Sequence, residues 1–215
     1  MPKYPNVSAS VTRRLPRYYR FLNALEKQGV ERISSKEFAL IIGLTASQIR
    51  QDLNCFGGFG QQGYGYKVTL LRREIGRILA LDNKIPAILL GAGNLGLAIA
   101  KHMDFEKDGF RLIGIFDKNP ALTGKKIRDW HIRSTDELES FCAKYGPKIA
   151  ALCIPAESAT EIADDLVKWG ITGFWNFSQC DLSFCEKDKV FVESVHLGDS
   201  LMTLRYYVDQ LETEE

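Results

Sequence analysis

The apolar positions near the start of the chain follow a helical period. Spacings of i, i+3, i+4 and i+7 predict an amphipathic helix that has Pro16 in its first turn and ends at Gly29. The residues on its inner face are Tyr18, Phe21, Leu22 and Leu25.

Two shorter helices follow, and each begins with a predicted capping box. Ser34 with Glu37 opens the first helix, and Thr45 with Gln48 opens the second, after a turn at Gly43. Their inward-facing residues are Phe38, Ile41 and Ile42 in the first helix and Ile49 and Leu53 in the second. Two short helices joined by a glycine-containing turn predict a helix-turn-helix, whose second helix reads base edges in the major groove. An ordinary helical hairpin with a solvated outer face is the alternative.

Residues 56–66 contain five glycines interleaved with aromatic side chains. This composition predicts a tight hairpin, since glycine permits positive φ and close backbone approach. After a helix-turn-helix, such a hairpin is typical of the wing of a winged helix, with a flexible linker as the alternative. A further amphipathic helix is then predicted from the apolar residues Leu70, Leu71, Ile75, Ile78, Leu79 and Leu81.

The middle of the chain carries a glycine fingerprint between a predicted strand over 86–90 and a predicted helix over 94–103. Its sequence, Gly-Ala-Gly-Asn-Leu-Gly at 91–96, suits a tight turn, the approach of a pyrophosphate to the backbone and close helix–strand packing. Free N–H groups at the helix N-terminus face the phosphates. A purely structural role for these glycines is the alternative.

Asp117 ends the next predicted strand, over 111–116, and lies 21 residues past Gly96. A carboxylate there accepts hydrogen bonds from the adenosine ribose hydroxyls and repels a 2′-phosphate. This favours NAD(H) over NADP(H), although the neighbouring Lys118 weakens the preference.

Strands and helices continue to alternate through the second half of the chain. The expected elements are a helix over 134–145, a strand over 149–154, a helix opened by Ser158 with Glu161 as its capping partner, and strands over 174–177 and 190–195. This alternation predicts a parallel, doubly wound sheet with ligands at the C-terminal ends of its strands. Residues 154–156 and 176–178 are therefore expected beside the cofactor.

The last segment carries an apolar seam with spacings of 4, 3, 4 and 3, formed by Leu197, Leu201, Leu204, Val208 and Leu211. Such a seam needs a partner surface, either on its own domain or on a second subunit. Because a helix-turn-helix protein needs a two-fold partner to read two half-sites, we favour a homodimer held partly by this helix.

Charge is divided unevenly along the chain. Residues 1–82 hold 13 Lys and Arg against 6 Asp and Glu, a net +7, whereas residues 83–215 hold 15 against 21, a net −6. A basic first segment predicts contact with a polyanion such as DNA, with chance clustering as the alternative.

The remaining composition excludes several classes of protein. The five cysteines are odd in number and form no Cys-x-x-Cys pair, which argues against a disulfide framework or a metal site and favours buried, reduced thiols. A redox-active thiol at Cys55, Cys180 or Cys185 is a minor alternative. Without a run of about twenty apolar residues or a secretory signal, we expect a cytoplasmic protein with no membrane partner.

Catalysis lacks a candidate motif, because the histidines His102, His131 and His196 lie in no recognisable catalytic pattern. The chain after Lys84 barely completes a nucleotide-binding domain, so no segment remains for a substrate domain. We therefore predict a sensor with no catalytic residues. An NAD-dependent enzyme with a dimerising N-terminal domain is the alternative, and the net +7 of residues 1–82 counts against it.

Over nearly the whole chain, these motifs resemble the Rex family of bacterial redox-sensing transcriptional repressors. The matching segments are Arg14-Leu15-Pro16, Arg32-Ile33-Ser34-Ser35, Ser47-Gln48-Ile49-Arg50, Phe56-Gly57 with Phe59-Gly60, Gly63-Tyr64-Gly65-Tyr66, Gly91 to Gly96, Phe116-Asp117, Gly124-Lys125-Lys126, Pro155-Ala156-Glu157 and Asn176-Phe177. The resemblance implies a homodimer with an exchanged C-terminal helix, and an operator that NADH releases and NAD⁺ permits.

The sequence departs from the family's pattern at several positions. Gln61-Gln62 stands where the wing usually has Lys-Arg, and Gln51 replaces a lysine of the recognition helix, so phosphate contacts are lost. His102 and His196 replace a tyrosine and an aspartate of the inter-subunit region that responds to NADH. A Rex-like regulator with an altered ligand or a pH response is therefore an alternative function.

These observations predict an α/β chain with a winged-helix DNA-binding domain over 1–82, a Rossmann NAD(H)-binding domain over 83–196 and a dimerisation helix over 197–215. The residues expected to bind the cofactor are Gly91, Ala92, Gly93, Asn94, Leu95, Gly96, Asp117, Lys118, Ile154, Pro155, Ala156 and Asn176. The residues expected to contact a double-stranded DNA operator are Arg13, Arg14, Arg17, Ser34, Ser47, Gln48, Arg50, Gln51, Gly60, Gln61, Tyr64 and Tyr66.

Overall fold

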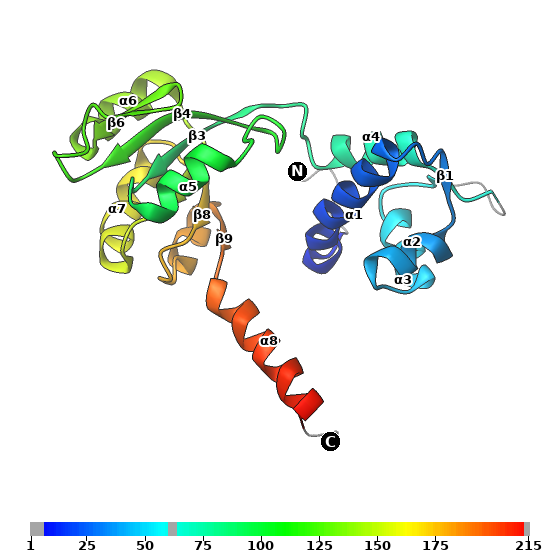
Figure 1. Ribbon diagram of the computed structural model, residues 1–215. Coiled ribbons are helices and arrows are strands. Elements are labelled where there is room, and N and C mark those ends of the chain that lie inside the picture. The colour runs from blue at the N-terminus through cyan, green and yellow to red at the C-terminus, as the bar shows by residue number, and fades with distance from the viewer. Residues whose placement is uncertain (1–6, 60–63, 213–215) are drawn as a thin grey trace. The chain divides into compact units, whose positions relative to one another are not determined.

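The computed structural model describes residues 7–59 and 64–212 (Figure 1). The chain divides into two compact units, Met1–Asn83 and Lys84–Glu215, and each is described by itself. No helix in the described part of the chain is long and apolar enough to cross a membrane.

The first unit is a small helical domain with a two-stranded sheet. Its elements are α1 (Ala9–Lys27), β1 (Arg32–Ile33), α2 (Ser35–Ile42), α3 (Ala46–Asn54), β2 (Tyr66–Lys67) and α4 (Val68–Ile78). β1 pairs with β2 in antiparallel register, with Ile33 opposite Tyr66. The strand before α2 is thus joined to the strand that follows α3 and the glycine-rich segment.

Helix α1 begins earlier than predicted. Ser8 caps it by accepting a hydrogen bond from the Val11 amide, and Pro16 lies inside the helix rather than in its first turn. The apolar stripe continues back to Val11 and Leu15, which are buried in line with Tyr18. Burial of these two side chains outweighs the one backbone hydrogen bond that proline removes.

The helix-turn-helix is confirmed. Ser34 Oγ accepts from the Glu37 amide at 3.1 Å and Glu37 Oε2 accepts from the Ser34 amide at 2.8 Å, which completes the first capping box. Gly43 ends α2 in the left-handed region at φ 65°. Thr45 caps α3 by accepting from the Gln48 amide, but the Gln48 side chain bonds Asp52, so the second capping box is incomplete.

Two other details of the first unit differ from the sequence-based expectation. Ile41 is exposed, and Ala39 takes its place in the core beside Phe38 and Ile42. In α4 the inner face starts at Val68, Leu70 is exposed, and the helix ends at Ile78. Within the predicted wing over 56–66, residues 60–63 lie outside the described residues, and Tyr66 begins β2.

The second unit is an open sheet between two helical layers. Its elements are β3 (Ile85–Leu90), α5 (Asn94–His102), β4 (Phe110–Asp117), β5 (Lys126–Ile127), β6 (Trp130–Ser134), η1 (Thr135–Glu137), α6 (Leu138–Tyr145), β7 (Ile149–Leu152), α7 (Ala156–Lys168), β8 (Gly173–Asn176), η2 (Ser183–Asp188), β9 (Phe191–Ser194) and α8 (Leu197–Glu212). The strand order is β5-β6-β4-β3-β7-β8-β9. Apart from β5, this is the order of a dinucleotide-binding Rossmann sheet.

The sheet is parallel except at one edge. β5 and β6 form an antiparallel pair that the sequence analysis did not predict, while every other pairing is parallel as expected. β6 is short and carries polar residues at its exposed positions, so its apolar pattern is weak.

The two faces of the sheet have separate cores. Ile88 and Leu90 of β3 pack with Phe141 of α6 and Ala163 of α7 on one face, and Leu89 packs with α5 on the other. Helix α7 begins at Ala156 with Pro155 as its N-cap, so the prediction that Ser158 opens it with Glu161 as partner is wrong.

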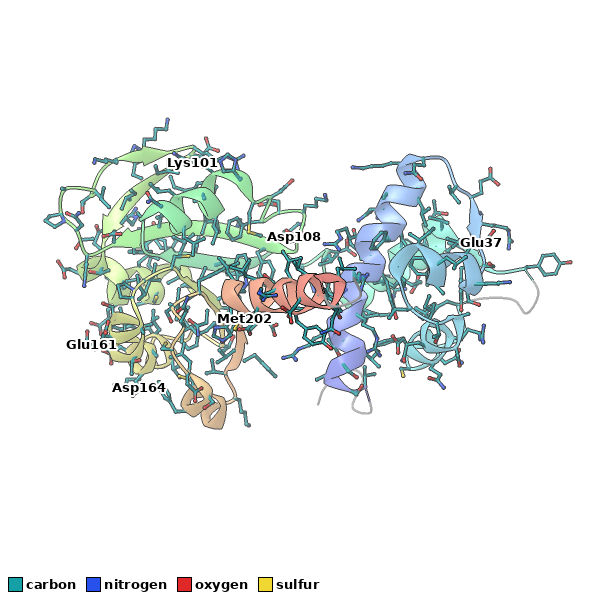
Figure 2. All side chains as sticks on the ribbon, turned by 60° about the horizontal axis from the view of Figure 1, so that its bottom comes forward. Glu37, Lys101, Asp108, Glu161, Asp164 and Met202 are labelled. Carbon is teal, nitrogen blue, oxygen red and sulfur yellow. The ribbon has the colours of Figure 1, made fainter. Side chains whose placement is uncertain are left out.

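Helix α8 carries the predicted apolar seam in a solvent-exposed state. The seam residues are between 41% and 69% exposed. Met202, Tyr206 and Tyr207 of the same helix are exposed as well, and Figure 2 shows Met202 on α8.

Candidate dinucleotide site and nucleic-acid interface

The turn between β3 and α5 has room for glycine alone at two of its three fingerprint positions. Gly91 adopts φ +96°, and a Cβ there would lie 2.3 Å from the Cys153 carbonyl oxygen. A Cβ on Gly96 would lie 1.8 Å from the Gly91 carbonyl oxygen. By contrast, a Cβ on Gly93 would meet nothing within 4 Å. The backbone of the turn is therefore closely packed at Gly91 and Gly96, whereas the space beside Gly93 is open.

Helix α5 begins at this open side with an uncapped N-terminus. Gly93 is its N-cap residue and provides no side-chain hydrogen bond to the first turn. Backbone N–H groups at such a helix start, together with the helix dipole, favour a negatively charged group.

Asp117 is held against the same turn at the end of β4. Its Oδ2 accepts a hydrogen bond from the Ala92 amide at 2.6 Å, and its Oδ1 accepts from the Asn119 amide at 2.8 Å. A carboxylate has about four acceptor positions, so each oxygen retains a lone pair for a ligand hydroxyl.

These groups line one cavity of about 500 Å³ above the C-terminal ends of β3, β4 and β7. Six of the predicted cofactor residues meet there: Gly91, Gly93, Asp117, Lys118, Ile154 and Pro155. Lys118 Nζ lies 3.3 Å from Ser158 Oγ of α7, which links the end of β4 to the start of α7. The crevice lies where the strand order reverses between β3 and β7, the position that Rossmann sheets use for ligands.

The cavity fits a dinucleotide. The open space at Gly93 and the uncapped start of α5 suit a pyrophosphate, and Asp117 suits the hydroxyls of an adenosine ribose. A nicotinamide dinucleotide bound there would bring a group whose oxidation state can be sensed.

One side of this cavity was missed by the sequence analysis. It is a face of α7 whose residues follow a helical period: Ser158, Glu161, Ile162, Asp165 and Trp169. The i, i+3, i+4, i+7 spacing is visible in the sequence, but only Ser158 and Glu161 were interpreted, as a capping pair.

Asn176 was expected to contact the cofactor, but the structure gives its side chain an internal role. The residue is 1% exposed. Its Nδ2 donates to the Cys180 carbonyl and to Ser194 Oγ, and its Oδ1 accepts from the Ser178 amide and hydroxyl. Every hydrogen-bonding position of the amide is used, so Asn176 braces the 176–180 turn against β9 and has none left for a ligand.

The other predicted cofactor residues do not line the cavity. Ala92 is buried, and Leu95 and Asn94 are exposed on the first turn of α5. Ala156 is the first residue of α7. Cys153 lines the cavity, and burial raises the pKa of its thiol to about 12, which makes it unreactive.

In the first unit, the outward residues of α3 are placed as a recognition helix requires. Ser47, Arg50 and Gln51 are exposed, and Arg50 Nη1 donates to Ser35 Oγ at 3.0 Å. Arg13 and Arg17 of α1 are also exposed, and Tyr64 is 71% exposed. All six side chains are exposed.

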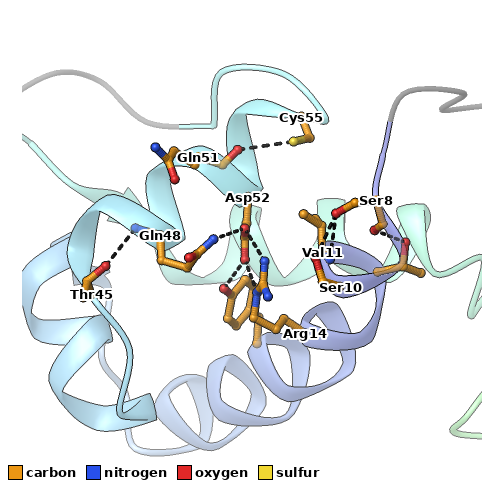
Figure 3. Close-up of polar contacts among 11 residues, drawn as sticks. Ser8, Ser10, Val11, Arg14, Thr45, Gln48, Gln51, Asp52 and Cys55 are labelled. Carbon is orange, nitrogen blue, oxygen red and sulfur yellow. Dashed lines mark hydrogen bonds and ion pairs between the residues drawn. The ribbon is translucent and has the colours of Figure 1, made fainter.

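Arg14 and Gln48 have a different environment from the one expected. Both side chains bond to Asp52, a residue of α3 that is only 1% exposed (Figure 3). Arg14 is bidentate to this carboxylate, so its guanidinium supports the domain interior instead of standing free for a phosphate.

Tyr66 must be removed from the set of DNA contacts. Its side chain is 8% exposed because it packs in the core of the first unit beside Ile33. Ser34 is engaged in the cap of α2. Gly60 and Gln61 lie outside the described residues.

Other chemistry finds little support in the described residues. No cluster of His, Cys, Asp and Glu among them has the arrangement of a metal site. Cys55 is exposed, whereas Cys142 and Cys185 are buried, so the expectation of buried thiols is wrong for Cys55. His102 and His196 are exposed, at the end of α5 and directly before α8.

A helix-turn-helix unit joined to a Rossmann sheet with a dinucleotide cavity defines a class of protein: transcriptional regulators controlled by a nucleotide. Comparisons with known families agree for each half. Residues 6–54 match the family described as "Putative DNA-binding protein N-terminus", and residues 82–180 match the family described as "CoA binding domain".

Relatives extend the match to the whole chain. The chain is 52% identical over 210 residues to "Redox-sensing transcriptional repressor Rex" of Clostridium botulinum (strain Alaska E43 / Type E3), covering 98% of this chain and 99% of that protein. A protein of the same name from Caldanaerobacter subterraneus is 53% identical, with 99% and 94% covered.

Solved structures point the same way. A structure titled "RSP in complex with beta-NADH" matches with a TM-score of 0.89 and 48% identity over 97% of each chain. One titled "RSP in complex with beta-NAD+ and operator DNA" matches with a TM-score of 0.87 and 50% identity, covering 96% of this chain and 94% of that one.

The chain belongs to the Rex family of redox-sensing transcriptional repressors. This confirms the resemblance drawn from the sequence. Since the relatives are named as repressors, it also decides for a regulator and against the alternative of an NAD-dependent enzyme.

Proposed function

We propose that this chain binds an inverted-repeat DNA operator through α3 and α1, and that NADH in the cavity of the second unit releases it while NAD⁺ permits binding. The observation that carries the proposal is the presence, in one chain, of an exposed recognition helix and a dinucleotide cavity. The titles of the solved relatives, which contain NADH in one case and NAD⁺ with operator DNA in the other, support both ligands.

The proposed DNA contacts are the exposed side chains of the first unit. Arg50 and Gln51 of α3 suit base edges or phosphates, and Arg13 and Arg17 of α1 suit phosphates. With glutamines at 51, 61 and 62, fewer cations reach the backbone, so we expect a shallow dependence of affinity on salt.

We further propose that the working unit is a homodimer. One face of the sheet is covered by α5 near β3 but leaves an apolar groove of about 480 Å³ toward β9, where Phe191 is 83% exposed. The groove is lined by Phe105, Phe110, Trp175 and Val192 among others. Helix α8 presents an exposed seam of matching apolar chemistry, so α8 of a second copy is the proposed occupant.

The experiment uses the full chain and a fluorescent inverted-repeat duplex selected by this protein from a random DNA pool. Its affinity is measured by anisotropy with NADH, NAD⁺ and NADPH added separately. We expect NADH to weaken binding at least tenfold relative to NAD⁺, and NADPH to act only at higher concentration because Asp117 repels a 2′-phosphate.

The two halves of the proposal fail differently. Equal affinity with NADH and NAD⁺ would overturn redox sensing but leave DNA binding intact, because a ligand that binds both states equally shifts nothing. Failure to enrich any duplex would overturn DNA binding itself.

A further inference from the structure

A buried carboxylate inside the recognition helix has all of its acceptor positions filled. Asp52 Oδ2 accepts from Arg14 Nε at 2.6 Å and from Tyr18 Oη at 2.5 Å. Its Oδ1 accepts from Arg14 Nη2 at 2.8 Å and from Gln48 Nε2 at 2.9 Å. Figure 3 shows the group between α1 and α3.

The charge on Asp52 is secured by its neighbours. Burial alone raises the pKa of this carboxyl, but the hydrogen bonds from Arg14, Tyr18 and Gln48 outweigh burial and lower it overall. An ionised carboxylate accepts hydrogen bonds and cannot donate them. Only the NH₂ side of the Gln48 amide can therefore face Asp52.

This fixes which way the Gln48 amide points. Gln48 lies in the first turn of α3, where a recognition helix meets base edges. A glutamine amide has two N–H donors and one oxygen, and Asp52 takes one donor. One N–H and the oxygen remain, which are the two groups that glutamine uses to bond adenine N7 and N6.

We propose that Asp52, held by Arg14 and Tyr18, is a positioning residue for operator recognition that orients Gln48 toward one base pair in each half-site. The inference rests on the proposed DNA-binding function and adds a source of sequence selectivity within it. Arg14, which was expected to touch DNA directly, acts through Asp52.

The test measures selectivity among duplexes. If Asp52 had a purely structural role, its substitution would lower the affinity for every duplex equally and leave this selectivity unchanged. Starting from the duplex that the unsubstituted protein selects, each base pair of a half-site is changed singly. Affinities of all these duplexes are then measured for the protein and its variants without dinucleotide. If the unsubstituted protein selects no duplex, DNA binding itself fails, which is distinct from failure of the positioning role.

Gln48→Ala is expected to reduce discrimination at one base pair by at least about fivefold. Asp52→Asn is expected to reduce discrimination at that same base pair, because asparagine can present either donor or acceptor to Gln48. The double variant should show no further reduction there. Ile75→Val is the control: Ile75 is buried in α4 and its side chain cannot hydrogen-bond Asp52, so discrimination should stay unchanged even if stability falls.

A loss of affinity by Asp52→Asn that is equal for every duplex would overturn the positioning role. If Asp52→Asn does not fold, the side-chain amide protons of Gln48 are followed by NMR in the unsubstituted protein bound to the selected duplex. Both Nε2 protons are expected to be protected there, one by Asp52 and one by the base, and two freely exchanging protons would overturn the inference.

Discussion

At the scale of single residues, the fingerprint glycines of this chain do different jobs. Gly96 is needed because its Cα lies against the Gly91 carbonyl, whereas Gly93 faces open space. Packing requires glycine at position 96, whereas we expect the bound ligand to require it at position 93. Stability and nucleotide binding should therefore respond differently to a methyl group at the two positions.

Gly96→Ala is expected to destabilise the second unit by about 1–3 kcal/mol, because the added Cβ meets a backbone oxygen that cannot move freely. The helix propensity gained by alanine, about 1 kcal/mol, is too small to offset this. Thermal unfolding followed by tryptophan fluorescence checks the loss, since Trp130, Trp169 and Trp175 all lie in that unit.

Gly93→Ala is the matched control for this prediction. Its unfolding temperature should match that of the unsubstituted protein, while its affinity for NADH, measured by calorimetry, should fall about tenfold or more. Unchanged affinity for NADH in Gly93→Ala would place the pyrophosphate elsewhere.

Residue types predicted which residues lie in the candidate site better than they predicted the contact partners of each side chain. Gly91, Asp117 and Pro155 meet in one cavity because the fingerprint and strand ends have strong local signatures. The internal partners of Asn176 and Arg14, which are Ser194 and Asp52, were not predicted because they are 18 and 38 residues away in the sequence. Such partners become visible only in the folded chain.

At the scale of elements, α1 shows tertiary packing overriding a local signal. Proline usually marks a first turn, yet α1 starts at Ala9 because Val11 and Leu15 extend its buried stripe. Helix α7 starts at Ala156, directly after Pro155 as its N-cap residue, and not at Ser158. The existence of the helices followed from periodicity, and the starts of α2, α3 and α5 followed from their local signals, whereas the starts of α1 and α7 did not.

Pro16→Ala should stabilise the first unit. Alanine restores an amide that can donate to the Thr12 carbonyl, which raises the free energy of unfolding by up to about 3 kcal/mol. The greater freedom of the unfolded chain lowers it by about 0.4–1 kcal/mol. The midpoint of urea unfolding of this unit, measured by circular dichroism, should shift to a higher urea concentration. The tryptophan signal of the other unit should stay unchanged, and Arg17→Ala, at the next exposed position, should shift neither. A destabilised Pro16→Ala would show that proline relieves a constraint of α1.

At the scale of the whole molecule, the apolar groove and the exposed α8 seam would cover each other if two chains associate. The seam was readable from the spacing of Leu197 to Leu211, but the groove was not, since it exists only where β7, β8 and β9 lack a covering helix on one face. Exposed apolar surface on both elements costs free energy in a lone chain, and mutual burial would recover it.

Ending the chain after His196 should therefore convert a dimer into a monomer, as measured by sedimentation equilibrium. Leu201→Glu with Leu204→Glu should do the same in the full chain, because both residues are exposed within one chain and their change leaves its own fold intact. Thr203→Glu, an exposed polar position of the same helix, is the control and should remain dimeric. Loss of the dimer removes simultaneous contact with two half-sites, so operator affinity should fall about 100-fold or more. A full-length chain that sediments as a monomer, or a truncated chain that stays dimeric, would show that α8 has another partner.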